Sequence, residues 1–505
     1  MIVTARTATA ALLSTGLFAF SSAAMATNGY FTHGVGTESK AMGGSGVGSS
    51  ENMGGISVAT NPALGVFADE KWQVGLSIFS PMRSYTASDS FAEGTQGAFT
   101  LSQGEYDSEN EAFPIPYIAK NWKLANDNAL TFVFYGRGGM NTEWDENQFA
   151  TFDPDGAGPA GPTPFPGVYG GGKAGVDLMQ AFISLNYSAK IGDNFAWGIG
   201  PVMAVQLFEA NGLTMFTPYT QTYADNFFPY FESAFGSCLQ GGGDPQTCEP
   251  QAQGQAQMQA FGDVTKLTNN GHDTSTGFGF ALGLWGGSDT FSYGLAYQSK
   301  MSMDEFGDYE QLYAEQGGFD IPSSIKAGIS FKPSDTTRFN IDIEHIAYTD
   351  VDSVSNPVAN LTGGCWTANP VDPFDPNTSP PFAVFPESSG CLGGPSGAGF
   401  GWDDMMVVKF GFVWDADDKN TWRFGYSYGE QPIPDSEVMF NILAPGLMEH
   451  HLTAGWTHVR PNGNVMSWSL MYAPTVDITG VSTFDPTQSI NIEMQQLEIE
   501  FAYRF

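Results

Sequence analysis

The last nine residues of the chain alternate between large apolar side chains and smaller or charged ones. Leu497, Ile499, Phe501, Tyr503 and Phe505 occupy every second position, and a period of two places all five on one face of a β-strand. A soluble protein could bury such a face in a sandwich. When the pattern recurs along a chain with an export signal, it indicates a transmembrane β-barrel, apolar toward lipid and polar toward the lumen.

The amino terminus has the pattern of a secretory signal peptide. Met1–Arg6 carries a positive charge, residues 7–22 are uncharged and mostly apolar, and Ala24-Met25-Ala26 supplies small residues at the cleavage positions. We therefore expect a signal peptide over residues 1–26, with Thr27 as the mature start. No later run of about 18 apolar residues occurs, so no transmembrane helix is expected.

Segments of alternating polarity, separated by clusters of Gly, Asn, Asp and Pro, recur throughout residues 72–505. The strand candidates are Trp72–Thr86, Ala112–Leu124, Ala129–Asp145, Asp177–Ile191, Phe195–Ala210, Thr274–Trp285, Thr290–Met303, Ser324–Lys332, Thr337–Asp350, Asp403–Trp414, Thr421–Glu430, Glu449–Val459, Asn464–Val476 and Asn491–Phe505. An even number of strands lets a bacterial barrel close with both ends in the periplasm, and closure pairs every backbone group in lipid. The predicted fold class is all-β: a fourteen-stranded antiparallel transmembrane β-barrel in the bacterial outer membrane.

The connections between these segments alternate in length, which predicts the orientation of the barrel. Short connections are expected in the periplasm and long loops outside the cell. The long ones are Glu146–Gly175, Asn211–Asp273, Asp304–Ser323, Val351–Trp402, Gln431–Met448 and Asp477–Ile490. Within the longest, Phe227–Phe235 and Gln251–Phe261 are expected to form short helices.

Charge and cysteine content restrict the function further. A formal net charge of −35 with only 19 Lys and Arg residues excludes a protein that binds a nucleic-acid backbone. The acidity is expected on exposed loops, where it either aids solubility in salt or binds divalent cations among the outer-membrane lipids. Cys238 and Cys248 lie in one long loop, and Cys365 and Cys391 in another. Local disulfides 238–248 and 365–391 are expected, although four cysteines allow three connectivities. No His or CxxC motif accompanies them, so no metal site is expected.

Strand parity predicts which cations face the lumen. In residues 406–414 the large apolar side chains are even-numbered, so Lys409 is expected to point inward. The same reasoning places Lys300 and Lys326 inward, and a weaker pattern does so for Arg137. Charge on the lipid face costs about 2–4 kcal/mol at the midplane for Arg or Lys, so inward cations need no special function. Each could form a lumen salt bridge or contact an anionic ligand.

Aromatic residues gather in the longest loop, which is unusual for a segment facing water. They are Phe216, Tyr219, Phe227, Phe228, Tyr230, Phe231 and Phe235. One interpretation is a groove that contacts a hydrophobic ligand. The other is a small core beside the 238–248 disulfide.

The segment Thr27–Lys71 precedes the first strand, is rich in Gly and Ser, and shows no periodicity. It is too small to bury a core of its own, so it is either a periplasmic tail or a plug inside the barrel. From about Gly34 to Phe505 the chain resembles the FadL/TodX family of outer-membrane transporters for long-chain fatty acids and other hydrophobic molecules. The resemblance rests on four stretches in the same order: KAMGGSGVGSSENMGGISVATNPAL, YGRGGMNTEW, YGLAYQSKMSMDEFGDY and EIEFAYRF.

The resemblance implies a barrel closed by an amino-terminal hatch over residues 27–71. It implies that extracellular loops capture the substrate, which moves to a pocket against the hatch and leaves through a side opening at a kink in the third strand. The matching residues are Asn61, Pro62 and Ala63 in the hatch, and Gly136, Gly138 and Gly139 in the kink. Glycines within a strand do mark bulges or bends. Gln298 departs from the family pattern, which often has an arginine there; Lys300 could substitute for it.

The predicted function is passive transport of long-chain fatty acids or similar hydrophobic molecules, gated by hatch rearrangement. The sequence has no nucleotide-binding loop, so a pump is not expected. No G-x-S-x-G motif accompanies the histidines, so a lipase is not expected. The alternative is a general porin or a structural or adhesive barrel. We expect no cofactor, a monomer, and recognition of Phe505 by the barrel-assembly machinery.

Overall fold

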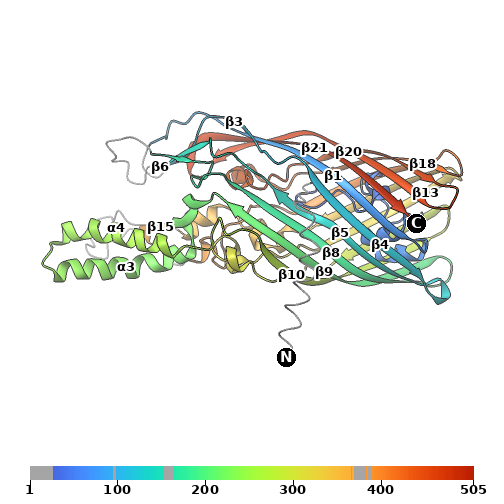
Figure 1. Cartoon of the computed structure of the whole chain (residues 1–505), viewed down its shortest axis with the longest axis horizontal. Coiled ribbons are helices and arrows are strands. Elements are labelled where there is room, and N and C mark those ends of the chain that lie inside the picture. Colours follow the sequence, from blue (N-terminus) through green and yellow to red (C-terminus); the bar gives the residue numbers. More distant parts are fainter. Residues whose placement is uncertain (1–26, 95–97, 153–162, 366, 369–382, 385–387) are drawn as a thin grey trace, which may run out of the picture.

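The computed structural model describes residues 27–94, 98–152, 163–365, 367–368, 383–384 and 388–505. The predicted signal peptide, residues 1–26, lies outside these described residues. Within them, fourteen long strands form the wall of a barrel (Figure 1). They are β1 (Trp72–Ala87), β4 (Phe113–Lys123), β5 (Ala129–Asn141), β8 (Gly175–Lys190), β9 (Phe195–Asn211), β10 (Asp273–Gly287), β11 (Phe291–Gln298), β13 (Ser324–Ser334), β14 (Thr337–Ile346), β17 (Met405–Asp415), β18 (Asn420–Gly429), β19 (His450–Val459), β20 (Val465–Ser482) and β21 (Asp485–Arg504).

The barrel closes in sequence order. Each wall strand is antiparallel to the next along the chain, and β21 returns to β1 over the register Gln73↔Arg504 to Ala87↔Ile490. Closure gives every wall strand a partner on both sides, as strands in lipid require. The predicted fourteen-stranded antiparallel barrel is confirmed.

Alternating side chains separate the lipid face from the lumen. On β1 and β21, Ile78 and Ile499 pair directly and are 47% and 46% exposed, whereas the inward Gln73 and Ser77 are buried. This arrangement puts apolar side chains on the outer surface and polar ones inside, as a membrane barrel needs. No described helix is both long and apolar enough to cross a membrane.

The segment before β1 fills the bore. Residues 27–71 are almost entirely buried and form the helical turn α2 (Thr37–Lys40) and two 3₁₀ turns, Gly55–Ala59 and Pro62–Val66. Lys40 forms ion pairs with Glu498 and, at 2.7 Å, with Glu500 on the wall. Backbone amides of Gly46 and Val47 donate to Asp342 Oδ2 at 2.6 and 2.9 Å. These bonds hold the segment, called the hatch below, against the wall.

The connections at one end of the barrel are short turns, and we call that end periplasmic. The long loops lie at the other end and carry the remaining elements. These are the strands β2 (Phe99–Leu101), β3 (Gly104–Asp107), β6 (Phe149–Phe152), β7 (Thr163–Pro166), β12 (Ser302–Met303), β15 (Thr367–Ala368) and β16 (Ala383–Val384), and the helices α3 (Gln221–Gln240), α4 (Pro245–Asp263), α5 (Ala314–Gly317), α6 (Asp352–Ser355) and α7 (Val438–Asn441).

Helices α3 and α4 form a hairpin that extends beyond the barrel along its long axis (Figure 1). The two short helices expected in this loop exist but are longer, and each begins earlier at a side-chain amino-terminal cap. Thr220 Oγ1 accepts from Tyr223 N, and Asp244 Oδ1 accepts from Thr247 N at 3.1 Å. The predicted disulfides are also present: Cys238–Cys248 ties α3 to α4, and Cys365–Cys391 links two turns of a neighbouring loop.

One predicted loop is wrong. Asp477–Ile490 is not a long connection, because β20 continues to Ser482 and β21 begins at Asp485. The two strands form an extended hairpin above the wall. The alternation weakens there because the outward side chains face water rather than lipid, which removes the pattern used for prediction.

A histidine ties the outer loops to the rim. His272 Nε2 lies 3.0 Å from Asp177 Oδ2 and His272 Nδ1 lies 2.9 Å from Glu209 Oε2. The hydrogen bond to Asp177, with the charges of both carboxylates, raises the pKa of His272 above its ordinary value of 6.5.

This raised pKa predicts a pH-dependent loop. A histidine that gains a proton more readily in the folded state contributes stability below its unfolded pKa, and the contribution is lost as pH rises through the raised folded pKa. We expect limited proteolysis to cut the 264–273 segment more slowly at pH 6 than at pH 8 in the wild type. The His272→Gln variant should remove the difference and His458→Gln, at the periplasmic end, should keep it. Equal cutting of the wild type at both pH values would contradict the prediction.

Candidate functional site

The wall is interrupted where the third wall strand bends. Strand β5 has a register shift between Gly136 and Gly138 against β8. The ladder between β4 and β5 ends at Tyr117↔Tyr135. Strand β4 nevertheless continues toward its extracellular end at Phe113 and still pairs with β1 there. Pro114 and Pro116 in this stretch have no N–H to donate. The hydrogen-bonded wall is therefore interrupted between β4 and β5 on the extracellular side of this residue pair.

A pocket of about 570 Å³, its open mouth included, lies at this gap. We call it the side pocket. Its lining is mainly apolar and consists of Pro114, Ile115, Pro116, Phe134, Gly136, Met179, Gln180, Ala181, Val205 and Leu207. Because Pro114, Pro116 and Phe134 alternate outward, the pocket is reached from the lipid side of the wall.

The hatch closes the inner side of the same bend. Thr32 N donates to Arg137 O at 2.9 Å, and Gly139 N donates to Tyr30 O at 3.0 Å, so the amino-terminal end of the hatch pairs with β5. A Cβ at Gly138 would collide with Gln180 Oε1 and come within 3.3 Å of Phe31 Cδ1. A side chain at this position would therefore have to displace the Gln180 side chain of the wall and would press on Phe31 of the hatch.

A polar cavity of about 360 Å³, its mouth included, lies inside the wall between the hatch and strands β5 to β13. We call it the inner cavity. Arg137 and Lys326 both line it, together with Gln298, Asn186 and Pro62 of the hatch. The amide atoms Gln298 Nε2 and Asn186 Oδ1 are buried and have no hydrogen-bond partner among the described residues. Buried amides without partners can be satisfied by a bound polar group.

Three of the predicted lumen cations meet at one carboxylate, Glu344 of β14. Its Oε1 lies 3.6 Å from Arg137 Nη2 and 3.3 Å from Lys326 Nζ, and its Oε2 lies 2.6 Å from Lys409 Nζ. The register explains part of this cluster, since Lys326 is directly opposite Glu344. The inward orientation predicted for Arg137, Lys326 and Lys409 is confirmed, and each forms the lumen salt bridge that was one of the two interpretations.

The three cations differ in what else they contact. Arg137 crosses the bore, donating to Gln298 Oε1 on β11 and, at 2.8 Å, to Ser324 Oγ on β13. Lys409 donates to His33 O of the hatch at 2.8 Å and is not part of the inner cavity lining. Its side chain therefore holds the hatch, whereas Arg137 and Lys326 face the cavity.

The predicted inward orientation of Lys300 is wrong. Strand β11 ends at Gln298, and the side chain of Ser299 is buried as well, so the alternation shifts by one residue. Lys300 is 41% exposed and pairs with Asp320 at 3.0 Å. Lys300 therefore does not substitute for the arginine that the family often has at position 298. Arg137 reaches Gln298 instead.

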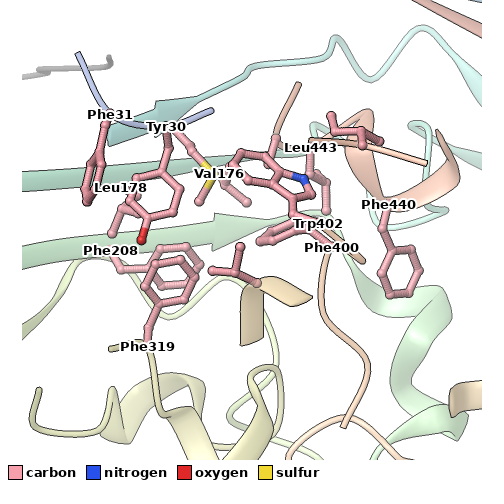
Figure 2. Packing of buried hydrophobic residues seen from close by; sticks show 14 of the residues in the cluster. Tyr30, Phe31, Val176, Leu178, Phe208, Phe319, Phe400, Trp402, Phe440 and Leu443 are labelled. Atoms are coloured by element: carbon pink, nitrogen blue, oxygen red, sulfur yellow. The ribbon is translucent and has the colours of Figure 1, made fainter. Parts of the chain in front are cut away.

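An apolar pocket of about 450 Å³ lies farther out, among the loops. We call it the outer pocket. Phe216, a predicted groove residue, lines it, and so do Phe440 and Leu443 of the 431–448 loop. That loop folds into the barrel mouth rather than away from it, and Trp144 Nε1 and Thr142 Oγ1 donate to its carbonyls. Figure 2 shows Trp402 and Phe400 between Tyr30 and Phe31 of the hatch on one side and Phe440 and Leu443 on the other.

The remaining predicted groove aromatics lie elsewhere. Phe227 and Phe231 pack with Phe228 and Phe235 against Ala252, Ala256 and Ala260 of α4. This is the small core beside the Cys238–Cys248 disulfide, the second interpretation of these residues. Tyr219 lies near Phe484, with 5.3 Å between ring centroids.

The hatch motif has a clear local role. Asn61 Oδ1 accepts from Ala63 N and caps the 3₁₀ turn that starts at Pro62, while its Nδ2 donates to Val47 O and Leu284 O, both at 2.9 Å. A Cβ at Gly283 on β10 would collide with Asn61 Oδ1. The motif therefore joins the hatch turn to strand β10 of the wall, on the periplasmic side of the inner cavity.

Two functional features were not predicted from sequence. Glu344 was not singled out, although its parity in β14 matches the inward Asp342. The inward fold of the 431–448 loop is the second feature; its signal in the sequence is the run of apolar residues from Val438 to Met448, which are buried.

Comparison with known proteins supports the same architecture. No protein-family model matches the chain, and no curated protein sequence matches it. The crystal structure of the P. putida toluene transporter TodX is similar at a TM-score of 0.55 and 15% identity, over 94% of this chain and 98% of that one. A Pseudomonas aeruginosa FadL homologue has a TM-score of 0.55 at 12% identity, over 94% and 99% of the two chains. The Ralstonia pickettii toluene transporter TbuX has a TM-score of 0.52 at 14% identity, over 94% and 98%. The fold implied by the resemblance in sequence is confirmed.

Proposed function

We propose that this chain, which shares the fold of TodX and the FadL homologue, transports hydrophobic molecules passively across the bacterial outer membrane. Long-chain fatty acids are the cargo that its site fits best. The observation that carries the proposal is the succession of three spaces: the outer pocket, the inner cavity, and the side pocket at the β5 bend. An apolar space, a cationic space and an apolar exit suit a molecule with one carboxylate and a long tail.

The outer pocket suits capture from outside. Its lining is apolar apart from Tyr313 and Ser353 and contains no charged side chain. Each CH₂ group buried there is worth about 0.8 kcal/mol. The acyl tail therefore dominates affinity, and this step selects for hydrophobic character rather than for a head group.

The inner cavity suits the head group. A buried carboxylate must be paired or hydrogen-bonded, and Arg137 and Lys326 face this space while sharing a single Glu344 partner with Lys409. The unpartnered Gln298 Nε2 adds a donor. The head group would thus be oriented beside the β5 bend.

The exit would use the side pocket, which lies across β5 from the inner cavity. Arg137 lines the cavity while its neighbour Gly136 lines the side pocket. Release requires the Tyr30–Thr32 end of the hatch to leave β5, because two backbone hydrogen bonds hold it there. A general porin is a poorer fit, since the hatch and the 431–448 loop fill the bore.

The Lys326→Gln variant tests the head-group assignment. Loss of one charged hydrogen bond, about 1.5–3 kcal/mol, should weaken binding of a long-chain fatty acid about tenfold or more. A fatty alcohol of the same length should bind almost as in the wild type. Binding is measured by titration calorimetry on purified barrel in detergent.

Lys332→Gln is the matched control, because Lys332 lies on the same strand but pairs with Asp335 at the periplasmic rim. It should bind both ligands as the wild type does. Equal losses of affinity for the acid and the alcohol in Lys326→Gln would show that the residue shapes the cavity but does not contact the carboxylate.

A further inference from the structure

One cation of the wall faces lipid instead of the lumen. Lys120 lies on β4, where the even-numbered side chains Pro114, Pro116, Ile118, Lys120 and Trp122 point outward. Among the described residues of the fourteen wall strands, it is the only Lys or Arg whose position alternates outward. Its neighbours on this face are otherwise apolar.

Two tryptophans flank this lysine. Trp72 is its direct cross-strand partner on β1, and Trp122 is two residues along β4. The Lys120 Nζ lies 5.9 Å from each indole ring, and the two rings meet edge to face with centroids 6.5 Å apart. Both tryptophans are more than a third exposed, so the group is open toward the membrane.

The three side chains present donors and no acceptor. An ammonium group carries three N–H donors and an indole carries one. Within the described part of the chain, no hydrogen bond or ion pair engages Nζ of Lys120 or Nε1 of Trp72 or Trp122. Cation–π contact stabilises the ammonium by about 0.5–1 kcal/mol at an exposed site but accepts none of these hydrogens in a directed way. The three side chains therefore have no anionic acceptor among the described residues.

Its depth identifies where such an acceptor would come from. Trp72 begins β1 and Lys120 is three residues from the end of β4, so the group lies at the periplasmic boundary of the wall. Tryptophan is typical of the headgroup level, and lysine near that level reaches phosphates. The acceptor available at this level is a phospholipid phosphate of the periplasmic leaflet.

We propose that Trp72, Lys120 and Trp122 form a binding site for the phosphate of an anionic phospholipid. The net-negative headgroup is favoured because no hydrogen bond or ion pair of the described chain neutralises the positive charge of Lys120 Nζ. The same outward face of β4 leads to the side pocket: Pro116 is about 13 Å from Lys120 along the strand at about 3.3 Å per residue. An acyl chain of the bound lipid therefore runs along Ile118 to the mouth of that pocket. The site needs only that the barrel spans a membrane, and does not depend on the cargo.

The test uses the full-length purified barrel and native mass spectrometry. Barrels are equilibrated with equimolar phosphatidylglycerol and phosphatidylcholine of the same acyl length, and the lipids retained are counted. We expect the wild type to retain phosphatidylglycerol in preference, and Lys120→Gln to lose about tenfold of that preference, as for one charge-assisted hydrogen bond. Lys419→Gln, which removes an exposed lysine from the periplasmic turn between β17 and β18, should behave as the wild type.

Three outcomes would overturn the proposal. The first is no preference for phosphatidylglycerol in the wild type, which needs no variant to observe. The second is the same loss in Lys419→Gln, which would show a general charge effect. The third is displacement of the retained phospholipid by an equimolar long-chain fatty acid, which would assign the site to a carboxylate instead.

Discussion

The Ala181→Trp variant should transport its cargo about tenfold more slowly than the wild type, which corresponds to a barrier about 1.4 kcal/mol higher. Ala181 lines the side pocket and pairs with Gly136 at the β5 bend. An indole at this position would fill the pocket from its lipid face. If the cargo leaves through the wall, the indole blocks its exit after the head group has bound in the inner cavity. The affinity for the cargo, measured in detergent, should therefore stay unchanged.

The variant is expected to fold, because Ala181 alternates outward and tryptophan is common on the lipid face of barrels. Uptake of a labelled long-chain fatty acid is measured in cells that lack other transporters of this kind, with barrel amounts matched. Ala327→Trp is the control, since Ala327 also points outward, on β13, and does not line the side pocket. Uptake at the wild-type rate in Ala181→Trp would mean that cargo passes the hatch into the periplasm.

The Glu344→Gln variant should be markedly less stable than the wild type. It removes the carboxylate shared by Arg137, Lys326 and Lys409. Removing one partner of a buried ion pair costs about 3–5 kcal/mol, because the remaining charges stay buried without compensation. We expect the barrel to lose its compact form in SDS gels at a clearly lower temperature than the wild type.

A double-mutant cycle separates this effect from a simple loss of packing. Glu344→Gln combined with Lys409→Met should be more stable than the sum of the two single losses predicts, with a coupling of at least about 1 kcal/mol. Glu493→Gln, an exposed outward carboxylate on β21, should change the unfolding temperature little. Additive losses in the cycle would show that the cluster does not act as a unit.

Much of the wall could be predicted because lipid imposes a strict period of two. Most wall strands were placed within a few residues. The exceptions are β11, which ends at Gln298 rather than Met303, and β20 and β21, whose outer ends leave the membrane. The disulfides were also predictable, since each pair lies within one loop. Lys300 was mistaken because a single break after Gln298 reverses parity, and nothing in the local sequence marks it.

The candidate site depends on contacts that run across the barrel. Glu344 is brought to Arg137 only because β5 and β14 face each other across the bore, and Arg137 reaches Gln298 and Ser324 for the same reason. Phe440 and Leu443 join Phe216 in the outer pocket because their loop folds inward. Phe227 and Phe231 turn away from it because their helix pairs with α4.

The amino-acid sequence by itself determined the barrel, its strand number and the sorting of side chains between lipid and lumen, since backbone pairing and apolar burial act on every second residue along a strand. The tertiary structure decided which lumen charges meet and which loop lines the outer pocket. The meeting of Arg137 with Glu344 and of Phe216 with Phe440 arises from contacts between residues about two hundred positions apart, and a local pattern carries no information about such contacts.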